Sequence, residues 1–233
     1  MRHASLAALA LVLLLSGCGR ERTGSGEASL WITRDRGATL LLVETVPAGL
    51  TAMQALDKRA DISKRYGGRY VQSIEGVEGD ISKRRDWFWF LNGIDADRSA
   101  ADYRLRPGDV EWWDFRSWSG VMREPVVVGA FPEPFLHGWD GNVREVAVRY
   151  APGRRRGAQA IGRLLHASSV EPLATAAPEG ANVFSVVGGL PRFTASLRES
   201  DSSAGSPVRF VFAGDVAGLA RDPAKFRYRY QVP

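Results

Sequence analysis

The sequence predicts an α+β fold built as two small domains. Short segments with the alternating polarity of half-buried strands recur along the chain, whereas only two segments have helical spacing. Glycine and proline residues separate these segments, as expected for turns between strands. Hydrophobic residues make up 45% of the chain, which argues against disorder and for a packed core.

We assign residues 30–118 to the first domain, which begins with two predicted strands. Residues 29–33 and 38–46 are rich in aliphatic and β-branched side chains, and Gly37 lies between them in a predicted turn. The proline and glycine that follow the second segment break the strand pattern. These two segments therefore predict neighbouring strands joined by a short turn.

A short helix is predicted next. Thr51 and Gln54 have the spacing of a capping box, in which each side chain bonds to the other residue's backbone N–H. Met53, Leu56 and Ala60 follow at i, i+3 and i+7, which places them on one face of a helix.

Three further strands complete the predicted first domain, at residues 69–74, 86–92 and 110–115. Pro107 and Gly108 suit the second and third positions of a type II turn before the last strand. The order of elements is strand, strand, helix, strand, strand, strand. One helix on a mixed sheet is the simplest arrangement of these elements, a fold of β-grasp type.

Residues 119–142 contain three prolines and are predicted to be a connector. Residues 143–233 are predicted to form a second, smaller α+β domain, whose family we do not recognise. Its predicted elements are a strand at 144–150, a helix at 158–166, and strands at 182–187, 192–197 and 208–213.

The N-terminus predicts a lipoprotein signal peptide at residues 1–17. Arg2 provides a positive charge, and residues 4–15 form an apolar run of about twelve residues, too short for the roughly twenty that span a bilayer. The run ends in the sequence LSGC, which resembles the bacterial lipobox and predicts cleavage before Cys18 and diacylglyceryl transfer to its thiol. We therefore expect an extracytoplasmic protein anchored to the cell membrane by lipid.

Residues 18–29 are predicted to form a flexible tether, in which the small and polar residues 19–29 extend over at most roughly 36 Å. Cys18 is the single cysteine, so the mature chain has no disulfide and no thiolate metal site. The isoelectric point near 9.6 reflects arginine, because only four of the 31 basic residues are lysines. Because export removes the usual nucleic-acid partners, we expect no nucleic-acid binding. The basic runs at 83–85 and 154–156 are interpreted as solvated turns.

Four motifs of the first domain resemble the C-terminal β-domain of the transcobalamin and intrinsic factor family, which includes many bacterial secreted proteins of unknown function. They are TAMQAL at 51–56, VQSIEG at 71–76, WFWFLNG at 87–93 and YRLRPGDVEWWDF at 103–115. The resemblance covers about residues 30–118. It implies a ligand-binding module with no catalysis, and a corrinoid such as cobalamin as the ligand.

In the animal members of that family, this domain covers one face of the corrinoid and a helical barrel covers the other. The present chain has no segment that resembles the barrel. The resemblance therefore implies a partner, either a separate helical-barrel protein or an importer subunit to which the ligand is passed. No covalent cofactor is expected other than the lipid on Cys18.

The aromatic strands carry the candidate ligand-binding residues. Alternation places Trp87 and Trp89 on one face of their strand and two phenylalanines on the other. One face must pack on the helix, whereas the other could be covered by the second domain, by a protein or by a flat ligand. The predicted ligand-binding residues are Trp87, Trp89, Asn92, Tyr103, Trp112 and Trp113.

Asn92 and Gly93 both tolerate positive φ and predict a tight turn, which could also present backbone amides to a ligand. Asp95 and Asp97 lack the other ligands of an EF-hand loop and are interpreted as solvated carboxylates. His137 could in principle coordinate cobalt, although we predict no metal site.

Because the sequence contains no catalytic motif, we expect no enzyme. A protein- or glycan-interaction module of the cell envelope is the alternative to small-molecule binding.

Overall fold

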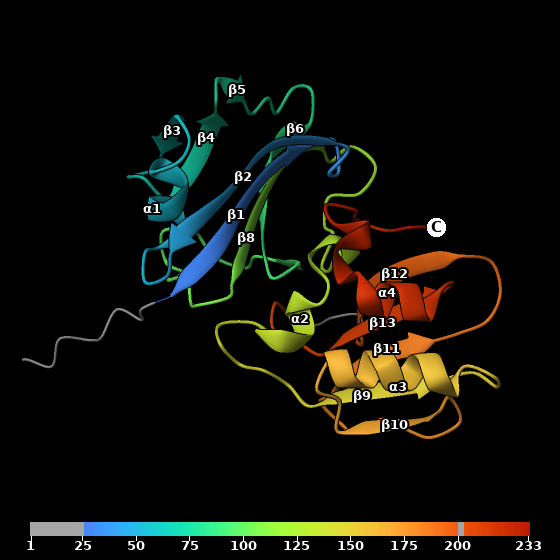
Figure 1. Ribbon diagram of the computed structural model, residues 1–233. Coiled ribbons are helices and arrows are strands. Elements are labelled where there is room, and N and C mark those ends of the chain that lie inside the picture. Colours follow the sequence, from blue (N-terminus) through green and yellow to red (C-terminus); the bar gives the residue numbers. More distant parts are fainter. Residues whose placement is uncertain (1–25, 200–202) are drawn as a thin grey trace, which may run out of the picture.

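The computed structural model describes residues 26–199 and 203–233. The predicted signal peptide, Cys18 and the first part of the tether therefore lie outside the described residues. The predicted α+β class is confirmed, with two sheet-based lobes side by side (Figure 1). Within the described ranges, every helix is too short or too polar to cross a membrane.

The main sheet of the first lobe is mixed, as predicted for a β-grasp arrangement. Its strand order is β2-β1-β8-β6-β7, in which β1 and β8 are parallel neighbours and all other neighbours are antiparallel. The strands are β1 (Glu27–Arg34), β2 (Thr39–Pro47), β6 (Arg85–Leu91), β7 (Ile94–Asp95) and β8 (Val110–Ser117). The short β7 was not predicted, because two residues are too few to show alternation.

Helix α1 (Ala52–Asp57) has the predicted capping box. The Gln54 amide donates to the Thr51 hydroxyl over 3.1 Å, and the Thr51 amide donates to Gln54 Oε1 over 2.9 Å. Met53 and Leu56 are buried on the face toward the sheet. The helix ends before the predicted Ala60, because the chain turns there to begin a strand at Ile62.

A small three-stranded sheet stands beside α1 at one end of the main sheet (Figure 1). It contains β3 (Ile62–Arg65), β4 (Tyr70–Ile74) and β5 (Val77–Glu78). The sequence predicted β4 alone. Strand β3 gives no strand pattern because its last three side chains are exposed, and β5 has only two residues.

The second lobe holds a separate five-stranded sheet, of order β10-β9-β11-β13-β12, in which only β12 is antiparallel to its neighbour. Helices α3 and α4 pack against each other, in front of the sheet as drawn in Figure 1. The sequence missed β10 and α4. The elements are β9 (Val146–Tyr150), α3 (Arg155–Leu164), β10 (Ser169–Pro172), β11 (Asn182–Val186), β12 (Arg192–Leu197), β13 (Val208–Ala213) and α4 (Val216–Arg221).

The segment predicted as a connector contributes to the packing of both lobes. It contains the 3-10 helix η1 (Val128–Ala130) and the helix α2 (Glu133–Leu136). Val127 and Ala130 pack on the first sheet, whereas Phe131 and Phe135 join the phenylalanine cluster of the second sheet. After α4, the 3-10 helix η2 (Pro223–Phe226) leads the C-terminal residues back to the first lobe.

Candidate functional site

The predicted aromatic residues of β6 and β8 lie mainly inside the first lobe. On the face toward α1 and the small sheet, Trp87 and Trp113 are only 6% and 4% exposed. Trp89 is half-buried and stacks on Trp113, with 6.0 Å between ring centroids. The Trp87 indole N–H donates to the carbonyl of Val77 over 2.8 Å, which ties this face to β5.

The opposite face of the sheet is covered by the C-terminal segment and the connector. Trp112 and Phe90 are fully buried there. The ring of Tyr230 packs against both of them, with centroid distances of 5.6 and 5.4 Å, and Tyr228 packs edge-on against Trp31. The sequence left open whether this face is covered by the second domain, by another protein or by a ligand. In the structure, the connector and the C-terminal segment of the same chain cover it.

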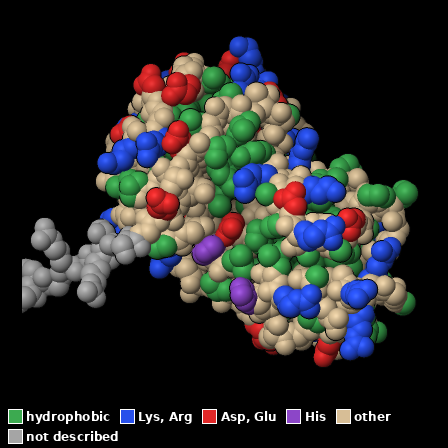
Figure 2. Space-filling model, viewed as in Figure 1, with side chains coloured by type: hydrophobic (Ala, Val, Ile, Leu, Met, Phe, Trp, Pro, Cys, Tyr) green, Lys and Arg blue, Asp and Glu red, His purple; other side chains and the backbone are tan. Residues whose placement is uncertain are grey.

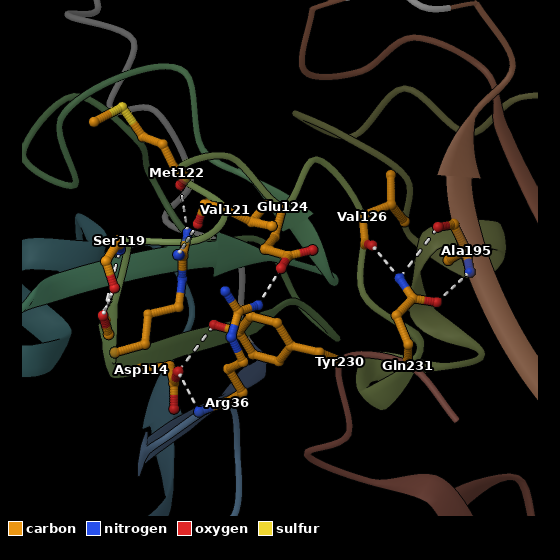
Figure 3. Close-up of polar contacts among 12 residues, drawn as sticks. Arg36, Asp114, Ser119, Val121, Met122, Glu124, Val126, Ala195, Tyr230 and Gln231 are labelled. Carbon is orange, nitrogen blue, oxygen red and sulfur yellow. Dashed lines mark hydrogen bonds and ion pairs between the residues drawn. The ribbon is translucent and has the colours of Figure 1, made fainter. Parts of the chain in front are cut away.

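Polar contacts hold this cover in place (Figure 3). The Tyr230 hydroxyl donates to Asp114 Oδ2 over 2.9 Å, and the backbone amide of Arg36 donates to the same oxygen over 3.1 Å. Burial and the neighbouring Asp114 raise the pKa of Tyr230 well above its usual value. The Gln231 amide bridges the lobes, because its Nε2 donates to the carbonyls of Val126 and Ala195 over 3.3 and 3.2 Å.

The side chains of Asn92 and Tyr103 form hydrogen bonds that hold the turn at the C-terminal end of β6. Asn92 has φ 52° and Gly93 has φ 79°, which confirms the predicted turn. The buried Asn92 side chain accepts from the Val110 amide over 2.7 Å and donates to Asp109 Oδ1 over 2.9 Å. The Tyr103 hydroxyl donates to the other oxygen of Asp109 over 3.1 Å.

Five of the six predicted ligand-binding residues are thus buried, and only Trp89 is partly accessible. The five buried residues belong to the packed interior of the first lobe. The aromatic strands therefore present no open surface on which a flat ligand could stack. Their role as ligand contacts stays a prediction, and a ligand must find its main surface elsewhere.

The other candidate residues are scattered. Burial raises the pKa of Asp95 to about 6, and the nearest cation is Arg123, 3.8 Å away. Asp97 pairs with the adjacent Arg98, and His137 pairs with Glu133 one helical turn earlier. Within the described ranges, no three His, Cys, Asp or Glu side chains gather as a metal site requires.

A groove of 950 Å³ opens between the small sheet and one end of the main sheet. Tyr66 and Tyr70 line it with their rings 5.8 Å apart, and the Tyr66 side chain is among the most exposed apolar groups, at 77%. Further lining comes from the ends of β1, β5 and β8 and from the turn at 80–84. The charged and polar lining residues are Arg34, Arg65, Gln72, Glu78, Asp80, Lys83, Arg85 and Asp86.

The inner wall of this groove is a layer of guanidinium groups on an aromatic ring. The guanidinium carbons of Arg85 and Arg34 lie 5.0 and 5.8 Å from the centre of the Phe115 ring. The Nε atoms of both arginines are buried and have no hydrogen-bond partner in the described structure. Both arginine side chains line the groove, where their positive charge meets a ligand that enters it.

Tyr70, on the side of the groove that Tyr66 and Tyr70 line, also makes a polar contact. The Tyr70 hydroxyl donates to Asp86, and burial together with this carboxylate raises the pKa of Tyr70. Tyr70 therefore keeps its proton at neutral pH and positions the carboxylate of Asp86 at the groove floor. Such a combination of exposed ring, guanidinium groups and carboxylates suits a flat ligand with polar edges.

Sequence reasoning missed this groove. The run at 83–85 was interpreted as a solvated turn, which is correct for Lys83 and Arg84, whereas Arg85 begins β6 and faces the groove. Tyr66 lies beside Gly67 and Gly68, between the predicted helix and the predicted strand at 69–74, and has no strand or helix pattern around it. An exposed tyrosine beside two glycines was the available signal.

A second accessible surface is the free edge of the main sheet. Strand β2 pairs only with β1 within the described part of the chain. Its side chains Leu40, Leu41 and Val43 are 49%, 41% and 45% exposed. Figure 2 shows hydrophobic side chains gathered over the β1–β2 hairpin. Exposed apolar edge strands are typical places for another chain to pair.

Comparisons with known proteins concern the first lobe. Residues 49–117 match a family described as a domain of unknown function, DUF4430. A protein from Ruminococcus gnavus ATCC 29149, described as a metal binding protein, is similar at 14% identity and a TM-score of 0.33, over 40% of this chain and 98% of that one.

Haptocorrin, in a complex with Cbi, is similar at 17% identity and a TM-score of 0.34. The likeness covers 40% of this chain and 26% of haptocorrin. No curated protein matches the chain. The relation to these two solved structures is distant.

Proposed function

We propose that this chain is an exported lipoprotein that binds a small molecule in the groove of its first lobe, with a corrinoid as the first candidate ligand. The observation that carries the proposal is the groove, whose 950 Å³ lies within the roughly 300–1,000 Å³ of small-molecule sites. It combines an exposed tyrosine ring with the two arginines, Arg34 and Arg85, that line its inner wall.

The groove replaces the aromatic strands as the proposed ligand surface. A corrinoid is a flat ring edged by amide groups, so its face could stack on Tyr66. Its amide oxygens could accept from Arg34 and Arg85, and its amide N–H groups could donate to Glu78. The resemblance of the four first-domain motifs to the transcobalamin family is a separate reason to test this ligand class first.

Replacing Tyr66 with alanine should weaken corrinoid binding about tenfold or more. Stacking contributes on the order of 1 kcal/mol beyond the area buried, and each Å² of apolar surface covered adds about 25 cal/mol. The measurement is calorimetry of the unlipidated mature chain with cobinamide and hydroxocobalamin. Because Tyr66 is exposed, its loss should leave the melting temperature unchanged.

Leu190→Ala is the matched control, since Leu190 is 83% exposed and lies in the second lobe. This variant should bind as the parent does. An equal loss in both variants would contradict the groove as the site. No heat with either corrinoid at high concentration would remove the corrinoid as the ligand.

The lipoprotein part of the proposal rests on the lipobox before Cys18, outside the described residues. Cys18→Ala should prevent lipidation and cleavage by the lipoprotein signal peptidase, so that the precursor accumulates or the chain is released to the medium. The measurement is the mass of the N-terminal peptide with and without globomycin. An unlipidated mature N-terminus in the parent, formed despite globomycin, would refute the anchor.

A lipid-anchored binding protein would pass its ligand to a membrane importer or share it with a separate helical-barrel protein. The alternative, an envelope protein- or glycan-interaction module, is favoured by the exposed apolar edge of β2. The variant Leu41→Cys places a thiol on this edge for cross-linking. A cross-link to an envelope component, together with corrinoid titrations that release no heat, would support that alternative.

A further inference from the structure

The second lobe contains a pocket of its own, on the sheet face away from α3 and α4. Val148, Phe184 and Phe210 pack with the helices, so alternation directs Arg149, Ser185 and Arg209 to the opposite face. These residues line a pocket of 350 Å³ beneath the segment at 173–177. Its other lining residues are Leu173, Thr175, Ala176, Ala177, Val183, Val187, Arg198 and Val211.

The lining holds three arginines and no carboxylate. The Arg149 side chain is 4% exposed, and its guanidinium donates mainly to neutral acceptors, the carbonyls of Thr175 and Ala176 at 2.9 and 2.8 Å. The nearest described carboxylate is that of Glu171, 3.8 Å away and 46% exposed. Glu171 lies outside the lining, so three guanidinium groups give the pocket a positive potential that favours an anion.

The other two arginines leave donors available. Arg198 Nη1 donates to the carbonyls of Pro178 and Ala181 over 3.0 and 2.7 Å, which fixes the side chain at the pocket while its Nε and Nη2 have no partner among the described residues. Arg209 is exposed and makes no ion pair within the described ranges. Ser185, a residue that is 8% exposed, adds a hydroxyl that bonds to no described residue.

We propose that this pocket binds a phosphate monoester that carries a short apolar group. Guanidinium groups bind such oxyanions through paired hydrogen bonds, and Ser185 supplies another donor. Val183, Val187 and Val211 form an apolar wall beside them. The volume lies near the lower end of the range for small-molecule sites, roughly 300 Å³.

This site is separate from the groove of the first lobe, so the two proposals fail independently. Calorimetry of the unlipidated mature chain with hexyl phosphate and with inorganic phosphate tests it directly. Hexyl phosphate should bind more tightly than inorganic phosphate, because the apolar wall covers its chain. Arg209→Gln and Arg198→Gln should each weaken hexyl phosphate binding about tenfold, the effect of losing one charged hydrogen bond.

Arg156→Gln is the matched control, because Arg156 is an exposed arginine of α3 on the other side of the sheet. It changes the net charge equally and should bind as the parent does. Flotation with vesicles that contain phosphatidic acid, whose headgroup is a phosphate monoester, separates the two sources of this ligand. Vesicle binding that Arg209→Gln abolishes would identify a lipid headgroup, whereas binding of hexyl phosphate alone would identify a soluble ligand.

Absence of binding to both hexyl phosphate and vesicles would overturn the proposal. So would an equal loss in Arg156→Gln and Arg209→Gln, since that result reports net charge alone. Melting curves of each variant show whether the fold is retained. Because Arg209 is exposed, the substitution Arg209→Gln should not alter the melting temperature.

Discussion

Replacing Tyr230 with alanine is expected to lower the free energy of unfolding by about 3–5 kcal/mol, as for other large aromatic truncations in a core. The Tyr230 side chain is 5% exposed and fills the space against Phe90 and Trp112. Its loss would leave a cavity over the aromatic face of the main sheet. It would also remove a hydrogen bond to the buried carboxylate of Asp114.

Urea unfolding followed by tryptophan fluorescence measures this effect, because Trp112 reports on the face that Tyr230 covers. Tyr230→Phe keeps the packing and loses only the hydroxyl, so it should cost about 1 kcal/mol. Tyr66→Ala removes the same side chain from an exposed position and should change stability little. A Tyr230→Ala protein as stable as the parent would show that the C-terminal segment does not hold the two lobes together.

Replacing Glu111 with glutamine is expected to stabilise the protein at neutral pH. Glu111 is fully buried on the α1 face of β8. Its Oε1 accepts from the Trp113 indole N–H over 2.6 Å, whereas its Oε2 has no hydrogen-bond partner among the described residues. Burial raises the pKa of Glu111 well above its ordinary 4.5, and the bond from Trp113 only partly offsets this.

The folded protein therefore holds this proton at pH values where the unfolded chain has released it. The free energy of unfolding should fall as pH rises above the unfolded pKa of 4.5, by up to about 1.4 kcal/mol per pH unit, until the folded pKa is reached. Glutamine has nearly the same shape and does not titrate, so Glu111→Gln should have the smaller slope.

Unfolding measured from pH 4 to 8 on both proteins isolates the contribution of Glu111. Asp95, whose pKa is raised to about 6, adds a slope of the same sign at lower pH in both proteins, and the comparison cancels it. Glu179→Gln changes an exposed glutamate and should follow the parent. Parallel profiles for the parent and Glu111→Gln would show that Glu111 is ionised in the folded protein.

Much of the first lobe could be predicted from its sequence. The capping box of Thr51 and Gln54, the turn at Asn92 and the long strands depend on side chains within a few residues of each other. Strands β3, β5, β7 and β10 were missed because they have two to four residues, and their pairing partners stabilise them more than their own pattern does.

The sequence by itself determined the longer strands of both lobes and that β6 and β8 carry aromatic side chains on both faces. Only the tertiary structure decided which of those faces remains open. Tyr230 donates to Asp114 across 116 residues of sequence, and with that contact the C-terminal segment covers Trp112. The groove at Tyr66 and Arg85 is likewise assembled from β1, the small sheet and β8. Alternation specifies which side chains share a face, whereas the exposure of that face depends on segments that meet only when the whole chain has folded.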